Sequence, residues 1–285
     1  MQVRTLSALA EAIDGMRVEP TKLDRSILDA ANIWAFDIET KPMLGHAYQA
    51  YKTNLSAKWV LEPGDIICWS AASYADPRKV YYMDVRGGYE RMLQGLWEVL
   101  DRASFMVTYN GGDPQTNGGF DYPRTKGYFA RLGWMLPRPA KSIDLFKTVR
   151  GMGWDFKSLY WAAEMMGLER NKIDNGGAGR WFDCIVRDDE QAWKDMRRYS
   201  VGDVRVTLDL YDALRPYIRS HPAVGFAAHD DETRCPRCGS NQVEAAGTVQ
   251  ATVVRYKQLR CLNPGCRGLF RSTFESRVTY NRSIG

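Results

Sequence analysis

The sequence predicts an α/β domain built around a mixed β-sheet, followed by a small cysteine-rich module. Two observations predict this arrangement. Short runs of β-branched and aromatic residues alternate with segments of helical period, in the order three strands, helix, strand, helix, strand, helices. Near the C-terminus, four cysteines form two close pairs. The 285 residues are enough for one large domain and one small module.

The composition is that of an ordinary globular protein, with 45% hydrophobic and 26% charged residues. No apolar run reaches the roughly 18 residues of a membrane span, and no basic leader precedes an apolar core at the N-terminus. We therefore expect no membrane association and a cytoplasmic location. Cys68 lies in an apolar run and Cys184 in an unremarkable segment, and both are expected to be reduced, partly buried thiols.

The positive charge is concentrated at the C-terminal end of the chain. The net charge of the whole chain is +5. Residues 251–285 hold seven arginines and lysines against one glutamate, a net charge of +6, so the first 250 residues carry −1. An asymmetry of this kind indicates a polyanionic partner for the tail.

The first expected strand is the segment on which the prediction of the main domain depends. Ile33, Trp34, Phe36 and Ile38 are strand formers. Other apolar runs predict further strands, so that the expected set is residues 32–39, 66–72, 80–85, 105–109 and 142–145. Between the first two strands, residues 41–60 are aromatic-rich and read as irregular.

Helices follow from the spacing of apolar residues. They are expected at 89–100, at 123–132 with proline in the first turn, at 159–168 and at 188–217, with a weaker one at 6–16. The last long helix should break near Gly202. Glycine and asparagine predict loops at 110–119 and 175–179. The resulting division is a helical lead-in at 1–30, the main domain at 31–220, a linker at 221–232, and the cysteine module with its basic tail at 233–285.

The first expected strand ends in two carboxylates, Asp37 and Glu39. Side chains two residues apart on a strand point to the same face. Two neighbouring carboxylates repel each other unless a cation lies between them, and hard divalent cations prefer oxygen ligands. A short D-x-E pattern is more often an exposed acidic turn, so its weight depends on acidic partners elsewhere.

Two further segments supply such partners. Residues 117–121, Asn-Gly-Gly-Phe-Asp, end in Asp121 just before an expected helix, where an aspartate is commonly an N-cap. Residues 199–203, Tyr-Ser-Val-Gly-Asp, place Tyr199 and Asp203 four apart, on one face if this stretch is helical. Each pattern is unspecific alone, but the three together, in this order, are much more specific.

With these three motifs the chain resembles the DEDD superfamily of 3′→5′ exonucleases, in its tyrosine subclass. Residues 36–40, 117–121 and 199–203 are similar to the three motifs of that superfamily, and the resemblance covers roughly residues 30–218. It implies a ribonuclease-H-like fold, a mixed five-stranded sheet flanked by helices with the first strand in the centre. It also implies two catalytic Mg²⁺ or Mn²⁺ ions, held by Asp37, Glu39, Asp121 and Asp203.

The implied reaction is hydrolysis of a phosphodiester from a free 3′ end, releasing nucleoside 5′-monophosphates. Two metal ions would activate water and stabilise the leaving oxygen. Tyr199 would orient the water, because a phenol with a pKa near 10 is a poor base at neutral pH. The histidine subclass does not fit, since His46, His221 and His229 are remote from Asp203 in sequence. A stand-alone exonuclease with an appended cysteine module resembles phage proteins.

Some candidate residues remain open. Asp113 lies in an earlier Asn-Gly-Gly-Asp segment and rivals Asp121; Asp121 is preferred because Phe120 precedes it and a helix follows. Asp144, at an expected strand end, could join the site or cap the next segment. Lys172 and Lys157 could contact phosphate, although solvated lysines are commoner.

The cysteine module predicts one structural zinc ion. Its four thiolates come from Cys235, Cys238, Cys261 and Cys266, with a hairpin expected between the pairs, a pattern typical of a zinc ribbon. A closed four-thiolate site is structural rather than catalytic, and so small a segment needs such a link to fold. The basic residues expected to contact phosphates are Arg255, Lys257, Arg260, Arg267 and Arg271.

Three functions are weighed. The favoured one is a metal-dependent 3′→5′ exonuclease that binds nucleic acid, DNA in preference to RNA, with a replication or repair protein as a further partner. The second is a ribonuclease-H-like endonuclease, which the spacing of Tyr199 and Asp203 disfavours. The third is a non-catalytic nucleic-acid-binding protein, which has no need of four convergent carboxylates.

Overall fold

The computed structural model describes residues 22–23, 25–49, 54–114, 118–173, 176–219, 221–227, 234–250, 254–271 and 276–277. The chain forms two compact units, one of residues 32–211 and one of residues 1–31 together with 212–285. The helix expected at 6–16 lies outside the described residues. Within the described part of the chain, no helix is long and apolar enough to cross a membrane.

The larger unit contains a five-stranded mixed sheet, which confirms the predicted α/β class. Its strand order is β5-β4-β1-β6-β7. Strand β4 is antiparallel to β1 and β5 is antiparallel to β4, whereas β6 and β7 are parallel to β1 and to each other. The central strand is therefore the one that carries Asp37 and Glu39. The strands are β1 (Ile33–Thr40), β4 (Ile66–Ser73), β5 (Val80–Asp84), β6 (Phe105–Thr108) and β7 (Lys141–Asp144).

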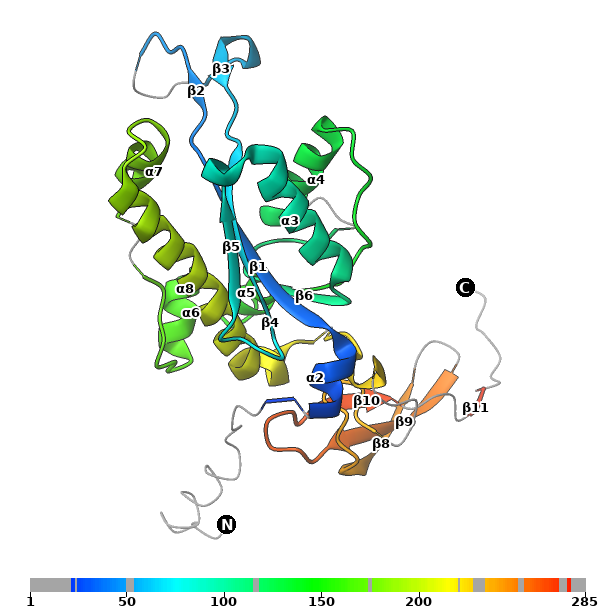
Figure 1. Cartoon of the computed structure of the whole chain (residues 1–285). Helices are drawn as coiled ribbons and strands as arrows, with labels where there is room; N and C mark the ends of the chain where they lie inside the picture. Colours follow the sequence, from blue (N-terminus) through cyan, green and yellow to red (C-terminus); the bar gives the residue numbers. More distant parts are fainter. Residues whose placement is uncertain are drawn as a thin grey trace, which may run out of the picture. The chain divides into compact units, whose positions relative to one another are not determined.

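Helices cover both faces of this sheet (Figure 1). Helices α3 (Tyr89–Arg102) and α4 (Asp121–Arg131) pack on one face, where Phe36 and Ile38 of β1 belong to their core. Helices α7 (Ala178–Ile185) and α8 (Glu190–Leu214) pack on the other face, against Ile67 and the free thiol Cys68. Because side chains alternate along a strand, Asp37 and Glu39 point to the face of α7 and α8.

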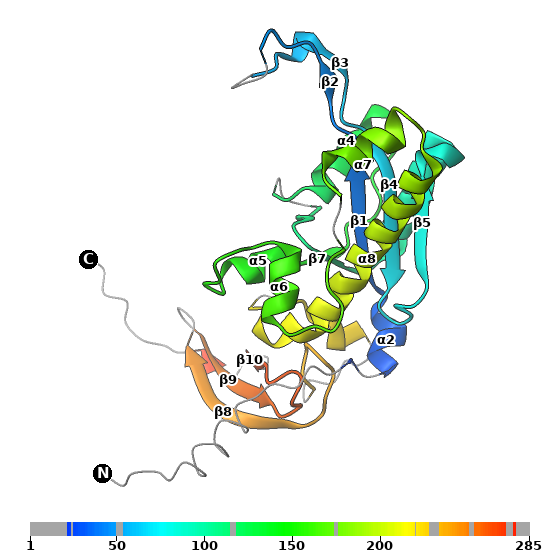
Figure 2. The ribbon, with the colours of Figure 1, turned by 90° about the vertical axis from the view of Figure 1, so that its left-hand side faces the viewer.

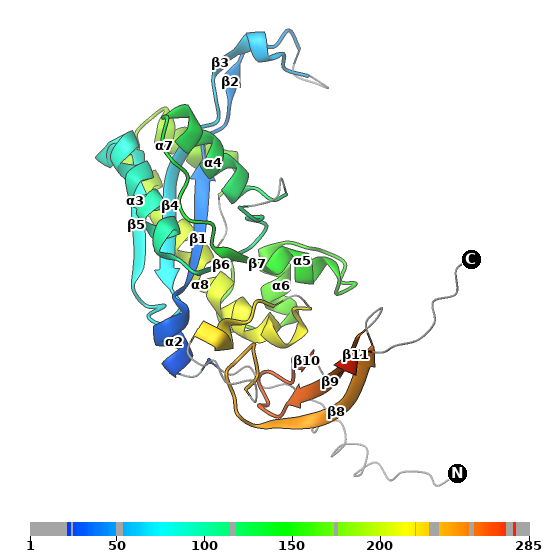
Figure 3. The ribbon, with the colours of Figure 1, turned by 90° about the vertical axis from the view of Figure 1, so that its right-hand side faces the viewer.

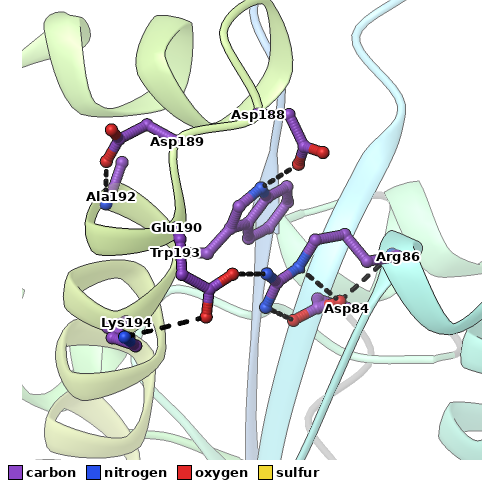
Figure 4. A network of polar contacts seen from close by, with 8 residues as sticks. All are labelled: Asp84, Arg86, Asp188, Asp189, Glu190, Ala192, Trp193 and Lys194. Atoms are coloured by element: carbon purple, nitrogen blue, oxygen red, sulfur yellow. Dashed lines mark hydrogen bonds and ion pairs between the residues drawn. The ribbon is translucent and has the colours of Figure 1, made fainter.

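A polar network around Arg86 fixes the first turn of α8 to the end of β5 (Figure 4). The guanidinium of Arg86 donates to Asp84 at 3.1 Å and to Glu190 at 2.8 Å. It also lies 4.9 Å from the ring centre of Trp193, whose indole N–H donates to Asp188 at 3.0 Å. The network links charged groups to the buried ring of Trp193 and so anchors the first turn of α8 against the sheet.

Helix α8 runs unbroken through Gly202, so the predicted break there is wrong. A Cβ atom at Gly202 would lie 3.1 Å from Cδ1 of Ile173, so the glycine lets the preceding loop pack close to the helix. Helix α4 begins two residues before Pro123, whose missing N–H would have no helical partner in the first turn. The short helices α5 (Leu145–Arg150) and α7 were not predicted, while α6 (Leu159–Met165) was.

The segment expected to be irregular after β1 forms a two-stranded arm. Strands β2 (Leu44–Gly45) and β3 (Val60–Glu62) pair antiparallel, with the turn η1 (Ala57–Trp59) between them. The arm extends past the end of β1 in both side views (Figures 2 and 3). Only a few backbone pairs define it, which explains why no strand pattern is visible in its sequence.

The smaller unit contains a second sheet, formed by the cysteine module. Strands β8 (Val243–Gln250) and β9 (Val254–Cys261) make the hairpin expected from the sequence, and β10 (Leu269–Arg271) and β11 (Ser276–Arg277) pair with β9. Helix α2 (Arg25–Ala31), η3 (Arg215–Tyr217) and η4 (Val224–Ala227) belong to the same unit. The boundaries expected at residues 30, 220 and 232 stay predictions.

We expect Trp193→Ala to lower the free energy of unfolding by about 3–5 kcal/mol, because it empties a buried site between α8 and the sheet. Lys194→Ala is the matched control on the same helix turn. Its ammonium is exposed, and its ion pair with Glu190, at 3.9 Å, is exposed as well. Its removal should therefore change stability by about 0–1 kcal/mol. Urea unfolding of both variants measures this, and equal losses would contradict the role given to Trp193.

Candidate active site

The centre of the candidate site lies at the end of β1 and is built from two segments of the larger unit. Asp37 and Glu39 come from β1, and Asp203 comes from α8. One carboxylate oxygen from each of these residues lies within 4.8 Å of the others. Residues from remote parts of the sequence thus converge on one face of the sheet, as the first and third motifs predict.

Helix α8 is held in register with the sheet by two buried serines. The hydroxyl of Ser70, on β4 beside β1, donates to the carbonyl oxygen of Ser200 at 2.8 Å and lies 2.7 Å from its hydroxyl. Neither serine is exposed to solvent. Ser200 is the residue after Tyr199 and three before Asp203, so this contact fixes both of them relative to β1. Tyr199 and Asp203 lie one helical turn apart, as their spacing predicts.

Asp121 approaches the site from the other side of β1. It is the first residue of α4, is 3% exposed, and accepts a hydrogen bond from the backbone N–H of Ile38 at 3.4 Å. It lies close enough to Asp37 for the two charges to repel. It is not among the three acids whose oxygens lie within 4.8 Å of one another. Asn117, the first residue of the second motif, lies outside the described residues.

The start of α4 is positioned by the loop before it. The N–H groups of Phe120 and Tyr122 donate to the carbonyls of Asn110 and Gly111, at 2.7 and 2.9 Å. Asp121 lies between these two anchors. The two passes of the loop touch at Gly112 and Gly119, both with positive φ, and a Cβ on Gly119 would lie 2.2 Å from the backbone nitrogen of Gly112. Only glycine allows this approach.

Asp144 anchors the same loop through backbone hydrogen bonds. Its carboxylate accepts hydrogen bonds from the backbone N–H groups of Asn110 at 2.8 Å, Gly112 at 3.1 Å and Phe146 at 3.1 Å. The last of these caps α5, so of the two roles open for Asp144 the structure shows the cap. Its charge also raises the pKa of Asp121. Asp144 thereby acts on the site through the loop that sets Asp121.

Asp113 does not share the environment of Asp121. Its charge acts on the phenol of Tyr122, whose pKa is raised first by burial and then by Asp113 and Asp121. Asp121, by contrast, accepts a hydrogen bond from the backbone N–H of Ile38 on β1 and raises the pKa of Asp37. The geometry therefore favours Asp121 as the acid that belongs with β1.

Burial, and to a lesser extent crowding, raises the pKa values of the acids. Burial raises the pKa of Asp37 well above its usual range, and the charges of Asp121, Glu39 and Asp203 add to this. Burial, followed by repulsion from Asp203, raises the pKa of Glu39 to about 8, and burial raises that of Asp121 to about 7. Burial also raises the pKa of Asp203, although Lys172 opposes this. These acids are therefore costly to ionise together without a cation.

Lys172 supplies one positive charge to the cluster. Its ammonium donates to Asp203 at 2.5 Å and lies 4.7 Å from the ring centre of Tyr199. Burial lowers the pKa of Lys172, but attraction to Asp203 and Tyr199 outweighs this and raises it. Nothing in its sequence context predicts this contact. Lys157, the other lysine considered, donates instead to the backbone carbonyl of Trp154.

Trp181 on α7 is a member of the site that the sequence did not indicate. Its hydrogen bond to Glu39 lowers the pKa of that carboxyl, against the larger effect of burial. Its ring meets the ring of Tyr199 edge to face, with centres 6.0 Å apart. Burial and the charges of Asp203 and Glu39 raise the pKa of Tyr199, so its phenol stays protonated. The unpredicted helix α7 thus covers the site.

The donor set fits a hard divalent cation. Oδ2 of Asp37 and Oδ1 of Asp203 are buried and have no hydrogen-bond partner among the described residues. Buried carboxylate oxygens without partners are unfavourable, and oxygen-coordinated Mg²⁺ or Mn²⁺ would satisfy them. The residues that could hold such ions are Asp37, Glu39 and Asp203, with Asp121 beside them.

The cysteine cluster fits zinc. All four Sγ atoms lie within 4.8 Å of one another, and the cysteines are free. Cys235 and Cys266 are 3.7 Å apart at sulfur, and Cys238 and Cys261 are 3.6 Å apart. Zinc–sulfur bonds of about 2.3 Å in a tetrahedron give sulfur separations of about 3.8 Å. The four thiols therefore already stand near the geometry of a structural zinc site.

The basic residues expected to bind phosphates do not all share one surface of the ribbon. Alternation along β9 places Arg255 and Lys257 on one face of the sheet and Arg260 on the other. The guanidinium of Arg271 lies 4.4 Å from the ring centre of Tyr256. Arg267 is exposed and follows Cys266, in a left-handed conformation.

The raised pKa values predict how pH acts on the protein without divalent cations. The unfolded chain releases the protons of these acids near pH 4, whereas the folded chain retains them up to about pH 7–8. The free energy of unfolding should therefore fall as pH rises from about 4 to about 8. Thermal unfolding at pH 5.5 and pH 8, after dialysis against buffer without Mg²⁺ or Mn²⁺, checks this.

Glu39→Gln is the control for that measurement. It removes one titrating group with little change of shape, so its stability should depend less on pH over the same window. Adding Mn²⁺ should stabilise the wild-type protein more at pH 8 than at pH 5.5, because ligand carboxylates must be ionised. A wild-type stability that rises from pH 5.5 to pH 8 would contradict the raised pKa values.

The chain was compared with known proteins and solved structures. No family model and no curated protein matches the chain. Among solved structures, RNase D of Trypanosoma brucei in complex with RNA U12 matches with a TM-score of 0.38 and 19% identity. The match covers 77% of this chain and 62% of that one, so less than two thirds of that structure is represented. At this level the likeness assigns neither a family nor an activity to the chain.

Proposed function

We propose that the larger unit is a metal-dependent 3′→5′ exonuclease that hydrolyses nucleic-acid phosphodiesters and releases nucleoside 5′-monophosphates. The observation that supports this is the convergence of Asp37, Glu39 and Asp203, with Asp121 beside them, at the end of the central strand. Tyr199, one turn before Asp203, supports exonuclease over endonuclease, in line with the resemblance of the three motifs.

Each residue has a distinct role in this proposal. The four acids hold divalent cations, which when bound supply an activated water and charge stabilisation for the leaving 3′ oxygen. Tyr199 stays protonated, so its hydroxyl orients the attacking water and does not act as a base. Lys172 offsets the charge of Asp203 and thereby reduces the repulsion between the acids and an anionic substrate.

The ribbon has a supporting role. We infer that Cys235, Cys238, Cys261 and Cys266 hold one structural zinc ion, consistent with their sulfur separations. The basic side chains of the ribbon strengthen nucleic-acid binding through contacts with phosphates, which do not depend on the base sequence. The residues proposed for this are Arg255, Lys257, Arg260, Arg267 and Arg271.

Asp203→Asn and Asp121→Asn should each lower nuclease kcat by more than about a hundredfold, since even outer partners of metal ligands matter 10- to 100-fold. Both changes remove a charge from a repulsive cluster, so stability should be maintained. Asp113→Asn is the matched control and should leave kcat little changed. Inactive Asp113→Asn together with active Asp121→Asn would move the second motif to Asp113.

The direction of hydrolysis is tested with linear DNA and RNA strands, single and double, labelled at either end, with Mg²⁺ or Mn²⁺. We expect a 3′ label to be released at once as mononucleotide and a 5′ label to shorten stepwise. Efficient cleavage of a closed circular single strand would show an endonuclease instead. No metal-dependent cleavage of any substrate would contradict the proposed activity.

A further inference from the structure

The arm between β1 and β4 has no core of its own. We define it as residues 41–49 and 54–65, the described part of the segment that leaves β1 after Thr40 and returns to β4 at Ile66. Backbone hydrogen bonds close it, from His46 to Trp59 and from Lys41 to Asp65, both at 2.9 Å. Not one of these arm residues is buried. The arm is therefore ordered by its backbone rather than by packing.

Large apolar side chains nevertheless gather on the arm. Tyr48 is 92% exposed, and Met43, Leu44 and Leu61 are each more than half exposed. Trp59 is 39% exposed and meets Tyr48 edge to face, with ring centres 5.4 Å apart. Exposed apolar groups in this density mark a surface that contacts another molecule.

A cleft lies at the base of the arm, next to the acidic site. Its volume is about 400 Å³, and its walls include Thr40, Met43, Arg124 and Trp181. Thr40 directly follows Glu39, and Trp181 hydrogen-bonds the carboxylate of Glu39. A ligand in the cleft would therefore lie at the base of the arm and beside the neighbours of Glu39.

The charges of the cleft favour an anionic ligand. Arg124 makes no ion pair among the described residues; its guanidinium donates to the carbonyl of Gly64 at 3.2 Å and lies 4.8 Å from the ring centre of Phe120. Lys41, also in the wall, is paired with Glu62. A guanidinium without an ion-pair partner, beside the exposed ring of Phe120, suits a ligand with phosphates and planar bases.

We propose that the cleft and the arm bind the nucleic-acid strand whose 3′ end enters the acidic site. Arg124 contacts a phosphate near the site, and Tyr48 and Trp59 stack on bases farther along the strand. Stacking needs unpaired bases, so the substrate class is single-stranded nucleic acid. This inference rests on the proposed function, because the acidic site defines which end of the strand lies in the cleft.

The experiment uses the full-length protein and two readouts. Affinity for a long fluorescent single strand is measured by anisotropy in the absence of catalytic metal, and KM and kcat are measured on the same strand and on a dinucleotide. The variants are Tyr48→Ala and Arg124→Ala. Tyr160→Ala, an equally large change at an exposed tyrosine on α6, is the matched control.

For Tyr48→Ala we expect Kd and KM for the long strand to rise about tenfold, the loss of one stacked base, while hydrolysis of the dinucleotide is unchanged. Arg124→Ala should weaken long-strand binding and reduce its dependence on salt. Long-strand affinity equal to that of the wild type in both variants would overturn the inference. If the wild type cleaves nothing, the proposed function fails, and the anisotropy data still decide whether the arm binds a strand.

Discussion

Mutual repulsion among buried carboxylates is the constraint around which the larger unit is arranged. Asp37, Glu39 and Asp203 bring oxygens within 4.8 Å of one another, and burial raises the pKa of each. A folded chain keeps such a cluster only when other parts of the structure determine it or when a cation offsets it. Lys172 supplies one charge, and the oxygens that remain without partners fit divalent cations.

Rigid supports hold each acid in place against this repulsion. The central strand carries two of them, and its neighbour β4 fixes α8 through Ser70 and Ser200. The Arg86 network fixes the first turn of the same helix. Asp144 holds the loop that sets Asp121. All three supports lie outside the group formed by Asp37, Glu39 and Asp203, so the acids do not have to hold one another in place.

Much of this could be predicted from the sequence, since the predictions rest on short local patterns. Alternation on β1 places Asp37 and Glu39 on one face, and helical spacing aligns Tyr199 with Asp203. The remainder depends on contacts between distant segments. Lys172 and Trp181 have no distinctive neighbours in the sequence. Gly202 suggests a helix break because its close packing against Ile173, which explains the glycine, cannot be seen in the sequence. The arm has too few backbone pairs to leave a strand pattern.

The crossing of Gly112 and Gly119 has a consequence for how variants of this protein should be interpreted. Neither residue carries a functional group, yet a side chain at either would push apart the two passes of backbone that place Phe120 and Tyr122. The displacement would reach Asp121 before it reached the hydrophobic core. Replacements at these bare positions would therefore mimic the loss of an active-site acid in a protein that still folds, and a mutational survey could mistake spacer glycines for chemical participants.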